Sequence, residues 1–115
     1  MGKLTTHVLD TARGRPAAGM RIDLMRGADS EDRIRSVATN ADGRTDSPLV
    51  EGSDLAAGAY RLVFHVGDYF RARGDPDAGR FLEDVPVVFV VDDPGGGYHV
   101  PLLVSPWAYS TYRGS

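Results

Sequence analysis

The 115-residue chain contains no cysteine, only one lysine and no long run of apolar residues. The absence of cysteine excludes disulfide bonds, thiolate zinc sites and a cysteine nucleophile. Without an apolar run of about 18 residues, no segment is long enough to span a bilayer as a helix. The first residues include no apolar stretch typical of a secretory signal, so we expect a cytoplasmic protein.

Charge, composition and length narrow the class of protein further. The formal net charge of −3 at pH 7 argues against nucleic acid or an anionic membrane as the main partner. Apolar residues make up 42% of the chain and charged residues 25%, which are ordinary values for globular proteins and exclude a generally disordered chain. At this length we expect residues 1–115 to form one domain.

The dominant periodicity in the sequence is two, which is typical of β-strands with one buried face. It predicts short strands at residues 4–9, 20–25, 34–39, 44–49, 59–66, 85–91, 98–105 and 107–112. One short helix is expected between Gly67 and Gly74, with Asp68 as its N-cap. Regularly spaced short strands with a single helix indicate an all-β fold, namely a two-sheet β-sandwich.

The connections between these strands also carry expectations. The Asp-Gly step at residues 42–43 is expected to form a tight hairpin turn between strands 34–39 and 44–49. The strand at 85–91 is almost entirely apolar, so it is expected to be covered on both faces. Residues 71–84 show no regular pattern, and we expect a mobile loop there.

Histidine, at positions 7, 65 and 99, supplies the few candidates for chemistry. His7 and His99 lie in expected strands, on the faces opposite to the core. If those strands are neighbours, the two imidazoles and an arginine could activate a water molecule without a metal ion. Each could equally be a surface or hydrogen-bonded histidine, and His65 is expected to be structural or solvent-exposed. The spacing of histidines and carboxylates matches no metal-site pattern, so we expect no metal.

Arg44 and the C-terminal tail each have two interpretations. Arg44 follows the Asp-Gly turn and is either a surface arginine or a fixed guanidinium that binds a planar, oxygen-rich anionic substrate. Residues 112–115, Tyr-Arg-Gly-Ser, either belong to the native chain or are a fragment of an expression tag.

Four segments together resemble one known family: LTTHVLD at residues 4–10, NADGR at 40–44, YHVPLLVSP at 98–106 and YSTYRGS at 109–115. They are similar to the transthyretin-related proteins, and the resemblance covers the whole chain. The ending YRGS is typical of the branch of 5-hydroxyisourate hydrolases rather than of the hormone carriers. The resemblance therefore implies that the tail is native.

The resemblance implies a transthyretin-like (prealbumin-like) fold, which is a two-sheet β-sandwich of about eight strands with one short helix. It also implies a homotetramer, a dimer of dimers with active sites between the dimers. The implied reaction is hydrolysis of 5-hydroxyisourate to 2-oxo-4-hydroxy-4-carboxy-5-ureidoimidazoline in urate degradation, without cofactor or metal ion. The alternative within the same family is a non-catalytic carrier of a small ligand.

Roles for individual residues also follow from the resemblance. It assigns catalysis to His7, Arg44, His99 and Ser115. It assigns substrate binding to His7, Arg44, Tyr112 and Arg113. The histidines would position and deprotonate the attacking water, and Arg44 would stabilise negative charge on the attacked carbonyl. Which histidine is the base stays open, as does whether Arg113 and Ser115 close the pocket or orient a histidine. We expect His7, His99, Arg44 and Tyr112 to line one cleft.

Overall fold

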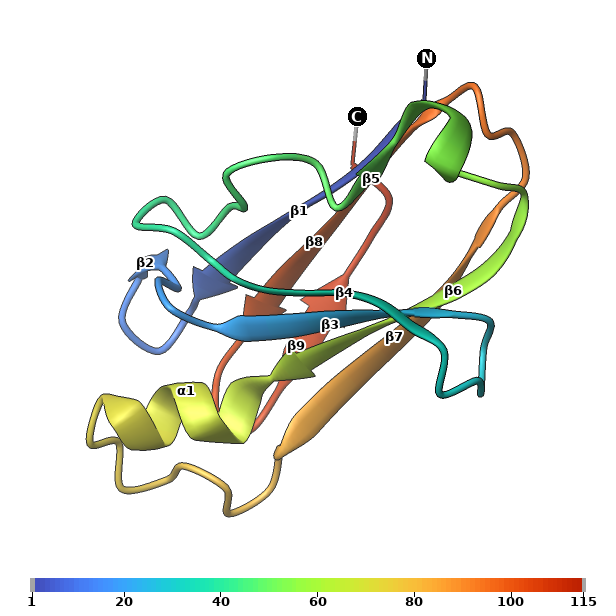
Figure 1. The fold of residues 1–115 in the computed structure, drawn as a ribbon. Helices are drawn as coiled ribbons and strands as arrows, with labels where there is room; N and C mark the ends of the chain where they lie inside the picture. The colour runs from blue at the N-terminus through green and yellow to red at the C-terminus, as the bar shows by residue number, and fades with distance from the viewer. Residues whose placement is uncertain (1, 115) are drawn as a thin grey trace.

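The computed structural model describes residues 2–114, so Ser115 and the role predicted for it lie outside the described residues. Two β-sheets pack face to face, and a short α-helix lies at one end of the sandwich (Figure 1). The expected two-sheet β-sandwich with a short helix is therefore confirmed.

The first sheet contains the strands from both ends of the chain. Its strands are β1 (Lys3–Asp10), β2 (Arg15–Pro16), β5 (Val50–Glu51), β8 (Gly97–Val104) and β9 (Tyr109–Thr111). Their order is β2-β1-β8-β9, and β5 pairs with the start of β1. β1 and β8 run parallel, whereas the other pairs in this sheet are antiparallel. β1 and β8 are thus the central strands, and β9 forms an edge.

The second sheet is antiparallel throughout. Its strands are β3 (Arg21–Arg26), β4 (Arg33–Ala38), β6 (Gly58–His65) and β7 (Asp84–Val91), in the order β4-β3-β6-β7. The helix α1 (Val66–Ala72) follows β6 directly and buries Tyr69 and Phe70. It begins two residues before Asp68, so the expected N-cap at Asp68 is wrong. A short 3₁₀ helix, η1 (Gly52–Asp54), follows β5.

The core lies between the two sheets and follows the period-two pattern of the sequence. In β1 every second residue from Leu4 to Asp10 is buried, and β6 buries Tyr60, Leu62 and Phe64 in the same way. Removing each large apolar side chain from water stabilises the fold by about 1.5–3 kcal/mol. Because side chains alternate along a strand, the residues between the buried ones point away from the core. On β1 and β8, these outward-facing side chains are the ones that can form a functional site.

The segment 44–49 does not form the strand expected from the sequence. After β4 the chain makes the expected turn, in which the Gly43 N–H donates to the Asn40 carbonyl at 2.9 Å. The chain then crosses to the first sheet, where the Val8 N–H donates to the Gly43 carbonyl at 2.8 Å. The hairpin interpretation is wrong because β1, not β4, supplies the hydrogen-bonding partners, and only the short strand β5 forms after the crossing.

The apolar strand β7 is not covered on both faces, as the sequence led us to expect. Its residues alternate between buried and exposed positions, with Val88 52% and Val90 63% exposed. β7 lies at the edge of the second sheet, where it pairs with β6. One face of this strand is therefore an apolar surface of the single chain.

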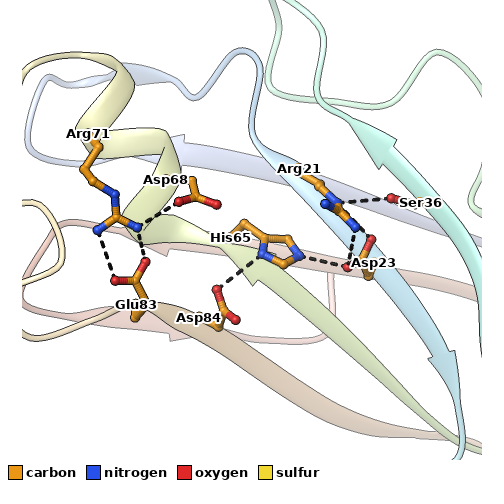
Figure 2. Close-up of polar contacts among 8 residues, drawn as sticks. All are labelled: Arg21, Asp23, Ser36, His65, Asp68, Arg71, Glu83 and Asp84. Carbon is orange, nitrogen blue, oxygen red and sulfur yellow. Dashed lines mark hydrogen bonds and ion pairs between the residues drawn. The ribbon is translucent and has the colours of Figure 1, made fainter. Parts of the chain in front are cut away.

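A polar cluster surrounds His65 at the junction of β6 and α1 (Figure 2). Its Nε2 lies 2.8 Å from a carboxylate oxygen of Asp23, and its Nδ1 lies 3.3 Å from a carboxylate oxygen of Asp84. Beside it, Arg71 of α1 donates to Glu83 at 3.0 Å, which ties the segment after the helix back to α1. His65 therefore links β3, β6 and β7 and is a structural residue, as expected.

Asp23→Asn should lower the free energy of unfolding at neutral pH by about 1–3 kcal/mol, because a buried charged acceptor is lost. Burial alone would raise the pKa of Asp23, but hydrogen bonds from Ser36 and His65 and the charge of Arg21 outweigh it and hold the pKa below 3.8. The stabilisation is present above pH 3.8 and disappears as the pH falls through the pKa of the folded state. Urea unfolding should therefore show a difference between variant and wild type that shrinks in acid; a constant difference contradicts this account.

Candidate active site

The outer face of the first sheet brings the two strand histidines into neighbouring positions. β1 and β8 pair in parallel, with Thr5 opposite His99 and His7 opposite Pro101. Because side chains alternate along each strand, Thr5, His7 and His99 point away from the core. The condition that the sequence left open, that the two histidine strands be neighbours, is therefore met.

Arg44 reaches this face because the chain crosses from β4 to the first sheet. It forms an isolated antiparallel bridge with His7. The turn before it is held by Asn40, whose Oδ1 accepts from the Arg44 N–H at 3.2 Å. Gly43 has a φ of 76°, and a Cβ there would lie 2.3 Å from the Val8 carbonyl oxygen. Glycine is thus required for the turn to pack closely on β1 and present Arg44 beside His7.

The ring of His7 is oriented by a backbone carbonyl. Its Nε2 lies 2.9 Å from the carbonyl oxygen of Asp42, in the same turn that precedes Arg44. A carbonyl oxygen only accepts hydrogen bonds, so Nε2 carries the hydrogen and, in the neutral ring, Nδ1 has the free lone pair. His7 is therefore a candidate base whose basic atom is Nδ1.

A cleft of about 510 Å³ opens on this face, and its lining includes Lys3, Thr5, Arg44, Asp46 and His99. The structure therefore brings Arg44 and His99 into one cleft. Burial, and then the positive charges of Arg44 and His7, lower the pKa of His99 below its usual 6.5. A histidine with a lowered pKa is neutral at physiological pH and can take part in proton transfer or hydrogen bonding.

The His99 ring should titrate with a midpoint below 6.5. The sign follows from the causes: burial and nearby cations disfavour the charged imidazolium, so a lower pH is needed to protonate the ring. NMR titration of the His99 ring signals measures this midpoint directly. Unfolding in urea provides the control, because an exposed imidazole should return to its ordinary value; a folded-state midpoint above 6.5 would contradict the described environment.

The C-terminal tail continues along the edge of β8 beyond β9. The Gly114 N–H donates to the His99 carbonyl at 2.7 Å, and this bridge has the same register as the pairing of β8 with β9. That register puts Tyr112 opposite Pro101, in the same cross-strand row as His7. Tyr112 is 60% exposed in the single chain.

Arg113 lies on the other side of the tail. Its guanidinium carbon is 4.3 Å from the centroid of the Tyr98 ring, and it donates to the Gly97 carbonyl at 3.1 Å. It lines a second cavity of about 360 Å³ beside β7, which Tyr112 also borders. The structure thus brings Arg44 and His99 into one cleft, and the bridge to Arg44 puts His7 next to it. Tyr112 and Arg113 line the second cavity instead, so the expectation that His7, His99, Arg44 and Tyr112 line one cleft is met only for Arg44 and His99.

Several cleft residues are not singled out by the sequence pattern. Thr5 Oγ1 lies 2.9 Å from Nδ1 of His99. Asp46 accepts a hydrogen bond from Asn40 Nδ2 at 3.0 Å, which ties the cleft wall to the turn before Arg44. The alternation of residues 4–9, which puts Thr5 on the same face as His7, could have identified Thr5 as a site residue. The sequence held no such signal for Asp46, because its position depends on where the chain crosses between the sheets.

The cleft offers imidazole, guanidinium, ammonium, hydroxyl and carboxylate groups. Among residues 2–114, no group of three or more His, Cys, Asp or Glu side chains is arranged to hold a metal ion. Within the same described range, no helix is both long and apolar enough to cross a membrane.

Comparison with known proteins supplies the family. A family model described as HIUase/Transthyretin family matches residues 4–114. The chain belongs to this family. It is 60% identical to 5-hydroxyisourate hydrolase 2 of Rhizobium meliloti, with 99% of this chain and 97% of that protein covered. It is 54% identical to the 5-hydroxyisourate hydrolase of Deinococcus radiodurans, with 97% and 95% covered.

Solved structures share the fold. (S)-allantoin synthase matches with a TM-score of 0.91 and 45% identity over 99% of this chain, which spans 44% of that longer protein. The Klebsiella pneumoniae 5-hydroxyisourate hydrolase matches with a TM-score of 0.84 and 32% identity over 100% of both chains. Sea bream transthyretin in complex with thyroxine matches with a TM-score of 0.84 and 26% identity, covering 97% of this chain and 94% of that one. Because the backbone is common to all three, the side chains of the site must distinguish between functions.

Proposed function

We propose that the chain hydrolyses 5-hydroxyisourate to 2-oxo-4-hydroxy-4-carboxy-5-ureidoimidazoline, as one domain of residues 1–115. The observation that carries the proposal is the meeting of His7, Arg44 and His99 at the outer face of the first sheet. The 60% identity to a 5-hydroxyisourate hydrolase over nearly the whole chain supports the same substrate. We also propose a cytoplasmic location, which cell fractionation tests.

Hydrolysis adds one water molecule across a ring amide of the substrate. As the water oxygen attacks the carbonyl carbon, a base removes one of its protons; the C–N bond then breaks and the ring nitrogen takes up a proton. We assign the base to His7, because its Nδ1 lone pair is free while Nε2 is held by the Asp42 carbonyl. His99, whose pKa is lowered, supplies a second, neutral imidazole. Proton transfer of this kind contributes about 10²- to 10⁴-fold to the rate.

Negative charge develops on the attacked carbonyl oxygen, and we assign its stabilisation to the guanidinium of Arg44, which lines the cleft. Tyr112 is proposed to contact the substrate, since it shares a cross-strand row with His7. Ser115 is proposed to act in catalysis on the strength of its place next to Gly114, which is bonded to His99. The proposed contact of Arg113 with the substrate requires its guanidinium to leave the Tyr98 ring.

We propose that the protein is a homotetramer, a dimer of dimers. The single chain exposes large apolar side chains at Phe81, Val88, Val90, Trp107, Tyr109 and Tyr112. These residues lie on or next to the edge strands β7 and β9, whose backbone edges could pair with a second copy. The Phe81 and Trp107 rings stack with their centroids 6.3 Å apart and add an aromatic patch to this surface.

Light scattering should give the wild-type protein four times the 12.4 kDa mass of one chain. Val90→Glu should reduce this mass, because assembly would bury an unpaired carboxylate in an apolar contact. Arg33→Glu is the matched control: it also changes an exposed residue on an edge strand, β4, and should keep the wild-type mass. A wild-type monomer at micromolar concentration would contradict the proposed assembly.

The ultraviolet absorbance of 5-hydroxyisourate, generated in the cuvette by urate oxidase, tests the proposed activity. The wild-type protein should speed its decay well above the spontaneous rate. If the decay stays at the spontaneous rate while the protein is folded, the hydrolase proposal fails. A non-catalytic carrier, comparable to the transthyretin solved with thyroxine, would then be the favoured function.

A further inference from the structure

Thr5 makes the only polar contact to the His99 ring among residues 2–114. Its Oγ1 lies 2.9 Å from Nδ1 of His99, and within those residues neither atom has another hydrogen-bond partner. The two residues are direct partners in the parallel pairing of β1 and β8, the central strands of the first sheet. The β-branched side chain of threonine has few χ1 rotamers, so the sheet fixes the hydroxyl relative to the ring.

The opposite side of the His99 ring is held by the tail. A Cβ on Gly114 would lie 2.5 Å from Cδ2 of His99, which shows how closely the tail backbone approaches the ring. The Gly114 N–H also donates to the His99 carbonyl at 2.7 Å. Thr5 thus contacts the Nδ1 side of the ring and Gly114 the Cδ2 side. Among residues 2–114 nothing is hydrogen-bonded to the remaining ring nitrogen, Nε2, and His99 lines the cleft.

The direction of the hydrogen bond between Thr5 and His99 decides what Nε2 can do. If the hydroxyl donates to Nδ1, the neutral ring carries its hydrogen on Nε2. If Nδ1 donated instead, Nε2 would be bare, and the hydroxyl hydrogen would face the cleft without an acceptor among the described residues. Either way one hydrogen has no acceptor among the described residues: the Nε2–H in the first arrangement and the hydroxyl hydrogen in the second. Only the first arrangement gives the ring an N–H at Nε2, which an anionic oxygen of a substrate would satisfy.

We propose that Thr5 is a positioning residue, whose hydroxyl donates to Nδ1 of His99 and holds the tautomer with hydrogen on Nε2. That Nε2–H then donates to the substrate oxygen that Arg44 also stabilises. This inference rests on the proposed hydrolase function and divides the work between the two histidines. The Asp42 carbonyl leaves His7 with a basic Nδ1, whereas Thr5 leaves His99 with a hydrogen-bond donor.

NMR of protein labelled with ¹⁵N in the histidine rings shows which nitrogen of His99 carries the hydrogen. Wild type and Thr5→Ser should both carry it on Nε2 near neutral pH, because both have the hydroxyl. Thr5→Val keeps the shape of the side chain without the hydroxyl and should give a mixture of tautomers. Thr6→Val is the matched control: it removes a buried hydroxyl, bonded to the Val100 carbonyl, from the opposite face of β1 and should leave the His99 pattern unchanged.

Kinetics give the second readout. Thr5→Val should lower kcat roughly 5- to 10-fold, the effect of losing one hydrogen bond, with KM nearly unchanged, and Thr5→Ser should restore kcat. A wild-type ring with its hydrogen on Nδ1, or a Thr5→Val protein with an unchanged tautomer, would overturn the inference and leave the hydrolase function standing. A wild-type protein that does not speed the decay of 5-hydroxyisourate would overturn the hydrolase function, while the NMR spectra still decide the tautomer.

Discussion

Replacing His99 with asparagine should slow the enzyme-catalysed hydrolysis of 5-hydroxyisourate by about 10²- to 10³-fold, the usual effect of losing one donor to a developing oxyanion. Asparagine places an amide near the position of the ring Nδ1, so the contact with the Thr5 hydroxyl can be kept. The asparagine side chain has no atom at the position of the ring Nε2. The variant therefore lacks the Nε2–H that is proposed to bind the substrate. The expected loss is in kcat, with the pairing of β1 and β8 intact.

His65→Asn is the matched control for this variant. It makes the same change at the third histidine, which lies on the second sheet between Asp23 and Asp84. His65→Asn should lower the free energy of unfolding but leave kcat unchanged. His99→Asn should lower kcat but leave the free energy of unfolding unchanged. Absorbance decay and urea unfolding of both variants measure the two effects. A His99→Asn protein with the wild-type kcat would remove His99 from the mechanism.

The faces occupied by the two site histidines could be predicted from the sequence. Alternation in residues 4–9 and 98–105 correctly put His7 and His99 away from the core, because alternation is a local property of an extended chain. Their neighbouring positions could not be predicted from that pattern. Thr5 and His99 are 94 positions apart in the sequence, and their strands meet only because the whole sheet assembles in this order.

The crossing of the chain from β4 to the first sheet, which brings Arg44 beside His7, could not be predicted from the local sequence either, because it depends on tertiary contacts. The Asp-Gly step correctly predicted a turn, but a turn does not specify which strand receives the chain after it. That choice is made by the Val8 N–H, which bonds the Gly43 carbonyl, and by the glycine that allows this close approach. A hairpin with β4 would have left Arg44 on the second sheet, away from His7.

For the C-terminal tail, the roles implied by the family resemblance and the positions in the structure differ. The family ending implied a native tail, and in the structure this tail bonds to His99 through Gly114. Resemblance also implied that Tyr112 and Arg113 act on the same substrate. Consecutive residues of an extended chain point in opposite directions, so Tyr112 shares a row with His7 while Arg113 packs on Tyr98. The substrate-binding role of Arg113 therefore remains a prediction.

Arg44→Met should lower kcat by about 10²- to 10³-fold, which is the usual effect of losing one donor to a developing oxyanion. Arg44→Lys separates two contributions of the same side chain. Lysine keeps the positive charge but lacks the planar fork of donors that can bind two oxygens at once. We expect Arg44→Lys to keep the lowered pKa of His99 and still lose much of kcat, because donor geometry rather than charge alone orients the substrate.

The two Arg44 variants should therefore differ in their His99 titration. Burial is the larger cause of the lowered pKa of His99, and the charge of Arg44 comes next. Arg44→Met should raise this pKa towards its usual value, whereas Arg44→Lys should not. Arg33→Met, which removes an exposed arginine from β4, should change neither the titration nor kcat. If Arg44→Met left the His99 titration unchanged, the two side chains would not share one cleft, and stabilisation of the oxyanion would have to come from another residue.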